Sequence, residues 1–335
     1  MQRVKAQPQP HPQGLQSCRA VFNSLTDLEL DQESVADSSL QARMVQWYPG
    51  HIARAERQLR EQLKLVDVVL EVRDARIPLS TCHPQIPQWC GSKPRLLVLN
   101  RVDMISPADQ QAWANYFAQQ HLPVFWTNGM DGTGITKVVR AAVSLSKSIN
   151  SKRSARGLKP RAVRAVAVGF PNVGKSALIN RLVNKRACDS APKPGVTRQL
   201  RWVRIGGDLD ILDAPGVLPM SFNDQIAAQR LAMCNDIGEA AYVDSLVAAA
   251  LLDTLVALPN APDIQEQLQR RFGMELPPEM TGEAYVEALA VKLFQSEKEK
   301  AGQRILKDFR STALGTLALE LPHMQPAHSA PRQRQ

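Results

Sequence analysis

The stretch 169–176, which reads Gly-Phe-Pro-Asn-Val-Gly-Lys-Ser, has residue types and spacings that suit the binding of phosphate groups. It follows the apolar run 165–168 and leads into the helical pattern 177–183. A strand, a glycine-bounded turn and a helix start in that order make backbone N–H groups converge on an anion at the positive end of the helix dipole. We therefore expect Lys175 to reach the β and γ phosphates of a nucleotide and Ser176 to hold Mg²⁺ through its hydroxyl. The other loop residues expected at the phosphates are Asn172, Val173 and Gly174.

Further along the chain, the Asp-Ala-Pro-Gly sequence at 213–216 directly follows the apolar run 209–212. An acid at a strand end beyond a phosphate loop can ligate Mg²⁺ directly or through water, so Asp213 is the predicted second metal ligand. The Gly216 N–H can approach the γ phosphate because no side chain blocks it. Thr197 lies in a Gly-Val-Thr sequence between the two motifs and is placed to add a second hydroxyl to Mg²⁺ and a backbone N–H to the γ phosphate.

The sequence Asn-Arg-Val-Asp at 100–103 is suited to recognise the base. A carboxylate such as that of Asp103 accepts two hydrogen bonds from the N1–H and the exocyclic amine of guanine, whereas adenine offers neither group in that geometry. A buried acceptor that is left unpaired therefore disfavours the wrong base. Together with the phosphate loop, this motif favours GTP over ATP. The expected base contacts are Asn100, Arg101 through its stem, Val102, Asp103, and the backbone of Asn128 and Gly129 at guanine O6.

Short apolar runs alternate with helical patterns up to about residue 220, which predicts a mostly parallel α/β sheet covered by helices. The expected strands are 66–72, 96–99, 123–126, 165–168, 200–205 and 209–212. The expected helices include a basic amphipathic one around 55–63, one at 107–119 capped by Ser106, and one at 135–145. From about residue 223 only helical patterns remain, which predicts an all-helical second unit. These patterns are 224–237, 240–255, 264–271, 283–295 and 301–319.

The formal charge of +9 and the pI of about 9.5 suggest a polyanionic partner. The segment 147–164, which we expect to be a linker before the phosphate loop, contains seven Lys and Arg residues and no acid. Such a run is compatible with RNA contact or with a merely solvated connection. The five cysteines form no C-x-x-C pair, which favours a reduced, cytosol-like compartment. No apolar run reaches the ~18 residues of a membrane span, so no membrane association is expected.

The base motif precedes the phosphate loop, although ordinary GTPases have the reverse order. The same sheet can be assembled from either order if the old termini are joined and new ones are opened. Together the motifs resemble the circularly permuted GTPases of the ribosome biogenesis GTPase A family, from about residue 45 to the C-terminal helices. The motifs that carry the resemblance are Tyr-Pro-Gly-His at 48–51, Asp-Ala-Arg at 74–76, Pro-Gly-Val-Thr at 194–197, and those at 100–103, 171–176 and 213–216.

This resemblance implies a circularly permuted P-loop GTPase domain, followed by an all-helical domain, that uses GTP/GDP and Mg²⁺. It also implies an assembly factor that binds the large ribosomal subunit precursor late in maturation, contacts rRNA and ribosomal proteins, and leaves after hydrolysis. An alternative from a different class is a GTP-dependent binding switch for another RNA or protein partner, in which hydrolysis has little role. A P-loop ATPase or kinase is a more distant reading, which Asp103 argues against.

Three positions depart from common GTPase patterns. Arg101 replaces the usual Lys of the base motif, and Ala177 lacks the family's second hydroxyl, so that only its backbone N–H can serve the α phosphate. Val217 stands where many GTPases carry a Gln that orients the attacking water. The resemblance points instead to His51, on the turn predicted at 47–51, although a helix-capping role is equally open. It also points to Asn172 as a ligand for K⁺ beside the phosphates.

The expected organisation is a disordered extension at 1–43, a GTPase domain at 44–220, a helical domain at 221–321 and a disordered tail at 322–335. We expect a monomer in a bacterial-type cytoplasm. The alternative location is a plastid or mitochondrion, if the first segment is a transit peptide.

Overall fold

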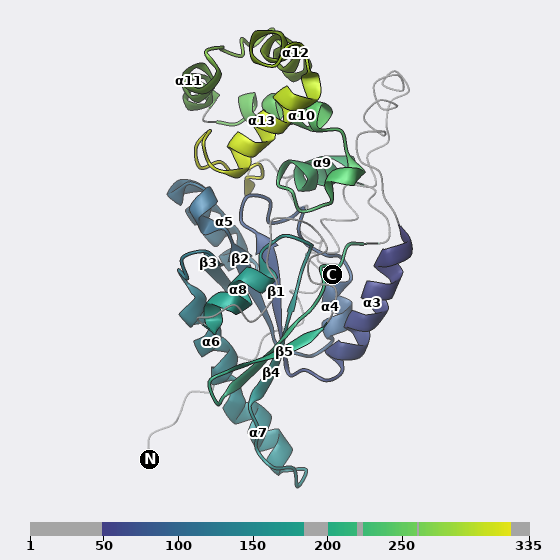
Figure 1. The fold of residues 1–335 in the computed structure, drawn as a ribbon. Helices are drawn as coiled ribbons and strands as arrows, with labels where there is room; N and C mark the ends of the chain where they lie inside the picture. Colours follow the sequence, from purple (N-terminus) through teal and green to yellow (C-terminus); the bar gives the residue numbers. More distant parts are fainter. Residues whose placement is uncertain (1–48, 184–199, 220–223, 260, 323–335) are drawn as a thin grey trace, which may run out of the picture.

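A computed structural model describes residues 49–183, 200–219, 224–259 and 261–322 (Figure 1). Six strands form one sheet in the order β3-β2-β1-β4-β6-β5. All neighbouring pairs are parallel except β5 with β6. The predicted α/β fold with a mostly parallel sheet is therefore confirmed. The strands are β1 (Val68–Asp74), β2 (Arg95–Asn100), β3 (Val124–Thr127), β4 (Val163–Val168), β5 (Arg201–Ile205) and β6 (Leu209–Asp213).

The strand order explains how a chain with reversed motifs forms one nucleotide-binding sheet. Strand β4, which leads into the phosphate loop, lies between β1 and β6. The three strands that precede it in the sequence lie on one side, and the two that follow it lie on the other. Because β2, β1 and β4 are parallel, their carboxyl ends meet at one edge of the sheet. The base motif after β2 and the phosphate loop after β4 therefore lie at the same edge, which confirms the circularly permuted arrangement.

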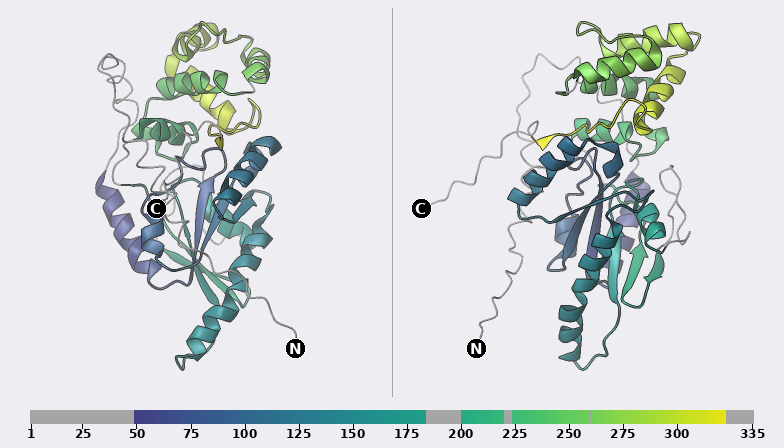
Figure 2. Two further views of the ribbon diagram at one scale, coloured as in Figure 1. Left: turned by 180° about the vertical axis from the view of Figure 1, so that it is seen from behind. Right: turned by 90° about the vertical axis from the view of Figure 1, so that its left-hand side faces the viewer.

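Helices cover both faces of the sheet (Figures 1 and 2). Strands β1 and β4 are buried on both faces because their residues alternate between two apolar clusters. Leu59 and Leu63 of α3 pack in the same cluster as Val69 and Val166, whereas Leu70 belongs to the opposite cluster. The helices on the first face are α3 (Pro49–Leu63) and α4 (Ile86–Cys90), and those on the second are α5 (Pro107–Gln119), α6 (Ile135–Ser144) and α8 (Lys175–Leu182).

The α-helices that follow β6 gather beyond the carboxyl ends of the strands, at the top of Figure 1. They are α9 (Gln225–Met233), α10 (Asp244–Val256), α11 (Ala261–Phe272), α12 (Gly282–Leu293) and α13 (Lys298–Arg310). Helix α10 has buried residues from Val247 to Leu255 and contacts the other four helices. The described part of 224–322 contains no strand of the sheet, in agreement with the predicted helical C-terminal region. No helix in the described residues is long and apolar enough to span a membrane.

Three expectations about local structure were wrong. The predicted turn at 47–51 is helical from Pro49, because proline is well accommodated in the first turn of a helix. The linker predicted at 147–164 begins with helix α7 (Ser146–Ser154). The last helix ends at Arg310, since Thr312 and Gly315 have φ of +60° and +100°. The apolar residues from Leu314 to Leu321 are buried in an irregular segment, the C-terminal strip, that packs against the rest of the chain.

Candidate functional site

The phosphate loop is shaped by two glycines in close contact with neighbouring strands. Gly169 follows β4 with φ of +153°, and a Cβ there would lie 2.1 Å from the carbonyl oxygen of Val72 in β1. Gly174 has φ of +97°, and a Cβ there would lie 2.2 Å from Nδ2 of Asn100. No side chain fits at either position. The loop is therefore pressed against both β1 and the end of β2, and it ends where α8 begins at Lys175.

Lys175 and Ser176 lie at the start of α8, as the sequence predicted. The Lys175 ammonium is buried and donates to the carbonyl oxygens of Phe170 at 2.7 Å and Gly169 at 3.2 Å. Burial lowers the pKa of Lys175 to about 8, although Asp213 and Asp236 raise it in part. An ammonium with so little solvent is suited to receive phosphate oxygens in place of loop carbonyls.

Ser176 and Asp213 form an oxygen pair beside the phosphate loop. The Ser176 hydroxyl donates to Oδ2 of Asp213 at 2.8 Å, and Asp213 is 1 % exposed at the end of β6. A hydroxyl and a carboxylate oxygen are the hard donors that Mg²⁺ prefers, and Mg²⁺ sites in nucleotide enzymes take few protein ligands. These two residues fit a Mg²⁺ site whose other ligands are phosphates and water.

Asn100 physically joins the base motif to the phosphate loop. It is 3 % exposed, and its Nδ2 donates to the carbonyl oxygen of Val173 at 2.8 Å. Its Oδ1 accepts from the Thr127 hydroxyl at 3.1 Å and from the Gly129 backbone N–H at 3.0 Å. One amide therefore ties the ends of β2 and β3 to the loop after β4. The Gly129 N–H, expected at guanine O6, donates to Asn100 in this structure.

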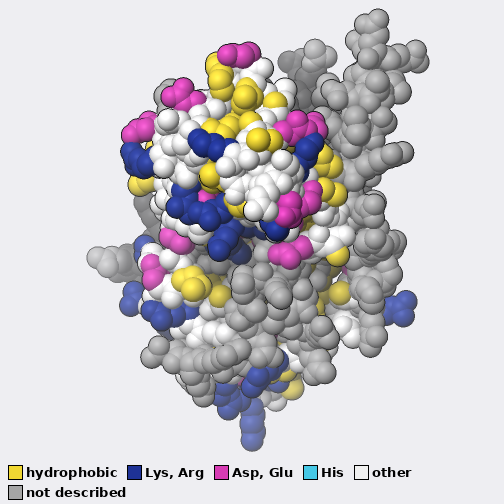
Figure 3. Space-filling view, turned by 45° about the horizontal axis from the view of Figure 1, so that its top comes forward, with side chains coloured by type: hydrophobic (Ala, Val, Ile, Leu, Met, Phe, Trp, Pro, Cys, Tyr) yellow, Lys and Arg dark blue, Asp and Glu magenta, His cyan; other side chains and the backbone are white. Residues whose placement is uncertain are grey.

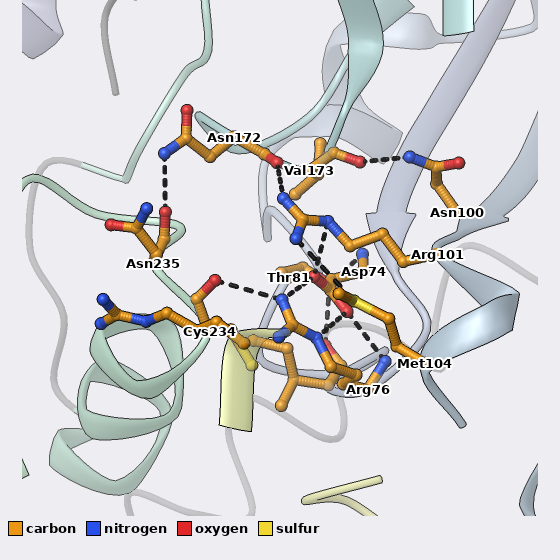
Figure 4. A network of polar contacts seen from close by, with 12 residues as sticks. Asp74, Arg76, Thr81, Asn100, Arg101, Met104, Asn172, Val173, Cys234 and Asn235 are labelled. Carbon is orange, nitrogen blue, oxygen red and sulfur yellow. Dashed lines mark hydrogen bonds and ion pairs between the residues drawn. The ribbon is translucent and has the colours of Figure 1, made fainter. Parts of the chain in front are cut away.

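Arg101 is turned toward the phosphate loop and the Asp-Ala-Arg motif (Figure 4). It has φ of +65°, its Nη2 donates to the Asn172 carbonyl, and its Nε lies 3.3 Å from Oδ2 of Asp74. Asp74 also holds the Arg76 guanidinium through bonds of 3.0 and 2.7 Å. Burial opposes the charge of Asp74, but Arg76 and Arg101 together hold the pKa of that carboxyl below its usual value. Asp74 and Arg76 of the Asp-Ala-Arg motif are thus a buried ion pair next to Arg101.

The end of α9 is attached to this cluster through its backbone carbonyls. The Asn235 carbonyl accepts from Nδ2 of Asn172 at 2.7 Å, and the Cys234 carbonyl accepts from Nη2 of Arg76 at 3.1 Å. The preceding two carbonyls accept from Arg310 of α13. The last turn of a helix leaves such carbonyls without intrahelical partners. Here the phosphate loop, the Asp-Ala-Arg motif and α13 satisfy them.

Asp236, directly after this turn, is fully buried, and within the described residues neither carboxyl oxygen has a hydrogen-bond donor. Burial, followed by the charge of Asp74, raises the pKa of Asp236 to about 8. Arg101, Arg76 and Lys175 are close enough to oppose this rise. A second acid thus lies behind the phosphate loop, contributed by the helical region of the chain.

The other predicted residues lie at the same sheet edge with different exposure. Asp103 is exposed in the short 3-10 helix η2 (Val102–Met104), and its carboxylate has no hydrogen bond or ion pair with another described residue. Asn128 uses its Oδ1 to accept from the Met130 N–H at 2.8 Å, which holds its own loop. Ala177 faces Gly129, since a Cβ on that glycine would lie 3.4 Å from the Ala177 Cβ.

Gly216 packs tightly on the phosphate loop, since a Cβ there would lie 2.5 Å from Pro171. Val217 is 2 % exposed in the apolar cluster under α3, so its side chain points into the protein and not toward solvent. Thr197 lies outside the described residues. His51 lies in the first turn of α3, where the structure describes the backbone alone.

Sequence reasoning missed the contribution of the C-terminal region. Nothing local marks Cys234, Asn235 and Asp236 as neighbours of the phosphate loop, because they follow an ordinary helical pattern. Glu320 was also missed. It is 1 % exposed and accepts from the backbone N–H groups of Leu79 at 2.7 Å and Ser80 at 3.0 Å. The available signal was that Glu320 is the one acid in the apolar segment 317–321.

Comparisons with known proteins agree with this geometry. The profile of a family described as "50S ribosome-binding GTPase" matches residues 164–270. The chain is 35% identical over 284 residues to ribosome biogenesis GTPase A of Bacillus licheniformis, which covers 83% of this chain and 99% of that protein. It is 30% identical over 297 residues to the mouse mitochondrial ribosome-associated GTPase 1, covering 83% of this chain and 90% of that protein.

The solved structures support the fold. A crystal structure of GNP-bound YlqF from T. maritima has a TM-score of 0.53 at 24% identity, covering 80% of this chain and 98% of that chain. The GDP-bound form of the same protein gives a TM-score of 0.51 at 21% identity. With the permuted motif order, the phosphate loop and the base motif at one sheet edge, these similarities show that the chain is a GTPase and belongs to the ribosome biogenesis GTPase A family.

Proposed function

We propose that this chain is a GTP-hydrolysing factor that acts late in assembly of the large ribosomal subunit. It binds the precursor particle, with its rRNA and ribosomal proteins, in the GTP state and leaves after hydrolysis. The printed names of its relatives, which refer to ribosome biogenesis and to 50S binding, support the partner. The observation that carries the switch is the contact between Asn172 of the phosphate loop and the Asn235 carbonyl at the end of α9. A phosphate-dependent movement of the loop would act directly on that helix.

In this proposal the nucleotide lies across Asn100, which connects the base motif to the phosphate loop. Asp103 pairs with guanine, and Lys175 leaves the carbonyls of Gly169 and Phe170 to bind the β and γ phosphates. Ser176 and Asp213 hold Mg²⁺, which supplies positive charge to the transferred phosphate. Further contacts come from Val102, Asn128, Gly129, Val173, Gly174, Ala177 and Gly216.

Hydrolysis needs a group that orients water, and Val217 has no polar atom and is buried. We assign this role to His51, with Thr197 as a further Mg²⁺ ligand and γ-phosphate contact. Asn172 supplies an oxygen for K⁺, whose charge offsets that developing on the phosphates. We place the GTPase domain at 44–220 and the helical domain at 221–321, in a monomeric cytoplasmic protein.

Single-turnover hydrolysis with and without purified large-subunit precursors tests the function. The expected result is a rate that rises with precursor concentration, together with co-sedimentation in the presence of a non-hydrolysable GTP analogue and release with GDP. A matched run with mature small subunits controls for nonspecific stimulation. No stimulation and no co-sedimentation would favour a GTP-dependent switch for another partner. Equal turnover in KCl and NaCl would refute the K⁺ role of Asn172 and leave the rest of the proposed function in place.

A further inference from the structure

Helix α7 and the segment that returns from it form an arm, residues 146–162, that projects from the sheet. The arm lies at the opposite end of the molecule from the helical region (Figures 1 and 2). It joins α6 to the beginning of β4, whereas the phosphate loop follows the end of β4. The six residues of β4, at about 3.3 Å each, separate the two by roughly 20 Å. Charges on the arm are therefore about two Debye lengths from the phosphate loop at 0.1 M salt, so their effect on a nucleotide bound there is largely screened.

The arm is held in a defined shape by its own polar contacts. Arg153 donates twice to the Lys159 carbonyl, both at 3.1 Å. The Asn150 side chain pairs with the backbone N–H and carbonyl of Arg161, each at 3.1 Å. Arg161 in turn forms an ion pair of 2.6 Å with Asp67, just before β1. Two of the seven basic residues noted in the sequence therefore build the arm and do not project freely from it.

The remaining basic side chains of the arm face solvent without a carboxylate to pair with. Lys147, Lys152, Arg156 and Lys159 are exposed, and among the described residues none of them forms an ion pair. The sequence contains no acid between Asp131 and Asp189. Figure 3 shows Lys and Arg side chains together at the lower tip of the molecule. The arm thus presents only positive charges, on a segment that its own hydrogen bonds hold in place.

The helical region has many basic residues but balances them differently. Arg270, Lys298 and Lys300 each form an ion pair with a neighbouring glutamate. In Figure 3 basic and acidic side chains are interspersed over that region. Within the part of the chain that the structure describes, the arm therefore carries exposed basic side chains without nearby acids.

An exposed aromatic side chain lies beside the root of the arm. Trp202 of the edge strand β5 is 42% exposed, and the Arg164 guanidinium lies 5.7 Å from its ring centroid. Arg164 is three residues beyond Arg161, at the start of β4. The neighbours of Trp202 in β5, Arg201 and Arg204, are exposed as well, and Arg204 also pairs with Asp210 at 3.1 Å. An aromatic ring stacked on a guanidinium and surrounded by basic residues is a surface on which an unpaired base can stack.

We propose that the arm and Trp202 form an RNA-binding surface separate from the helical region. The arm contacts the phosphate backbone through Lys147, Lys152, Arg156 and Lys159, and Trp202 stacks on an unpaired base. The inference rests on the proposed function for its RNA, which is that of the large-subunit precursor. It goes beyond that function in assigning the contact to the end of the sheet that is remote from the nucleotide.

Protein-free large-subunit rRNA, transcribed in vitro, is the first probe. The variant Lys152→Gln/Arg156→Gln/Lys159→Gln removes three charges from the arm, and Arg270→Gln/Lys298→Gln/Lys300→Gln removes three from the helical region. Binding is measured from 50 to 300 mM KCl. Three lost phosphate contacts lower the steepness of log K against log salt by about 2–3 and reduce affinity about 100-fold near 0.1 M salt. The control variant changes both by much less. Equal effects of the two variants, or an unchanged slope in the arm variant, would overturn the proposal.

Trp202 provides a second test that does not depend on charge. Trp202→Leu weakens binding to the same rRNA about tenfold, and Trp202→Phe restores most of it, because stacking needs an aromatic face. Equal affinities of the Trp202→Leu and Trp202→Phe variants would remove the stacking role. Basal GTP hydrolysis and thermal unfolding of every variant match wild type, since the substitutions are remote from the nucleotide.

Precursor particles separate this inference from the proposed function. If the wild-type protein binds rRNA through the arm but ignores the particles, the assembly function is wrong and the surface assignment stands. If the arm variant loses particle binding but retains affinity for protein-free rRNA, the arm contacts a ribosomal protein and the RNA assignment is wrong. If wild-type protein fails to bind the rRNA at all, the RNA surface is refuted.

Discussion

Asn100 makes the sharpest prediction because one buried amide connects three parts of the site. Asn100→Ala leaves the Val173 carbonyl, the Thr127 hydroxyl and the Gly129 N–H without their partner. A buried polar group without a partner costs about 1–3 kcal/mol, and Val173 and Thr127 are fully buried. Since the hydroxyl can rotate and Gly129 is half-buried, we expect a loss of about 2–4 kcal/mol in the free energy of unfolding.

Urea denaturation and titration with fluorescent GDP measure the two consequences of Asn100→Ala. Thr127→Val is the matched control, because it removes one of the three hydrogen bonds and should cost about 1 kcal/mol. Asn100→Ala should also weaken GDP binding at least about tenfold, a loss of about 1.4 kcal/mol, because the phosphate loop loses its tie to the base motif. If Asn100→Ala lowers the free energy of unfolding no more than Thr127→Val does and leaves GDP affinity unchanged, the hydrogen bonds of Asn100 do not organise the site.

Three further changes test other contacts. Gly216→Ala places a Cβ 2.5 Å from Pro171, so the phosphate loop must shift, and a GTP titration that matched wild type would contradict this contact. The pKa of Asp236 is about 8 in the folded protein against an ordinary 3.8, so burial of this acid makes wild-type stability fall as pH rises from about 4 to 8. Asp236→Asn should remove that fall. If the urea midpoint changed by the same amount between pH 5 and pH 8 in wild type and in Asp236→Asn, this prediction would be refuted. Glu320→Gln weakens the hydrogen bonds that Glu320 accepts from Ser80, which should lower the free energy of unfolding by about 1–3 kcal/mol. Proteolysis of the C-terminal strip should then be faster. An unchanged cleavage rate would argue against a role of Glu320 in holding this segment.

The nucleotide-binding sheet was predictable because its signals are local. The phosphate loop requires a strand before it, a helix after it and glycines where close approach excludes a side chain, and all of these are visible in 165–183. Helix 107–119 with its Ser106 cap was predicted in full, since the cap and the first-turn proline are both written in the sequence. The permuted order followed from the positions of the motifs alone.

Elements held by distant contacts were less predictable. Helix α7 has no buried residue and therefore no apolar periodicity, and contacts from Asn150 and Arg153 to the returning chain hold it in place. The apolar strip after Arg310 resembles a continuing helix because packing, and not helical spacing, places its residues. Asp236 reaches the phosphate loop only through the fold of the helical region. None of these contacts leaves a pattern in the neighbouring sequence.

The central claim is that Asp103 and Lys175, far apart and in reversed order along the chain, hold opposite ends of one guanine nucleotide. The most direct measurement is the nucleotide preference of Asp103→Asn, determined by competition of GTP, XTP and ATP for the protein. The substitution removes the hydrogen bond from the exocyclic amine and the negative charge that strengthens the bond from N1–H. At about 1.5–3 kcal/mol for a hydrogen bond to a charged group, these losses should weaken GTP binding about 100-fold. XTP should bind better than GTP, because the new amide can donate to its C2 oxygen. A variant that binds GTP as tightly as wild type and still rejects XTP would contradict the claim.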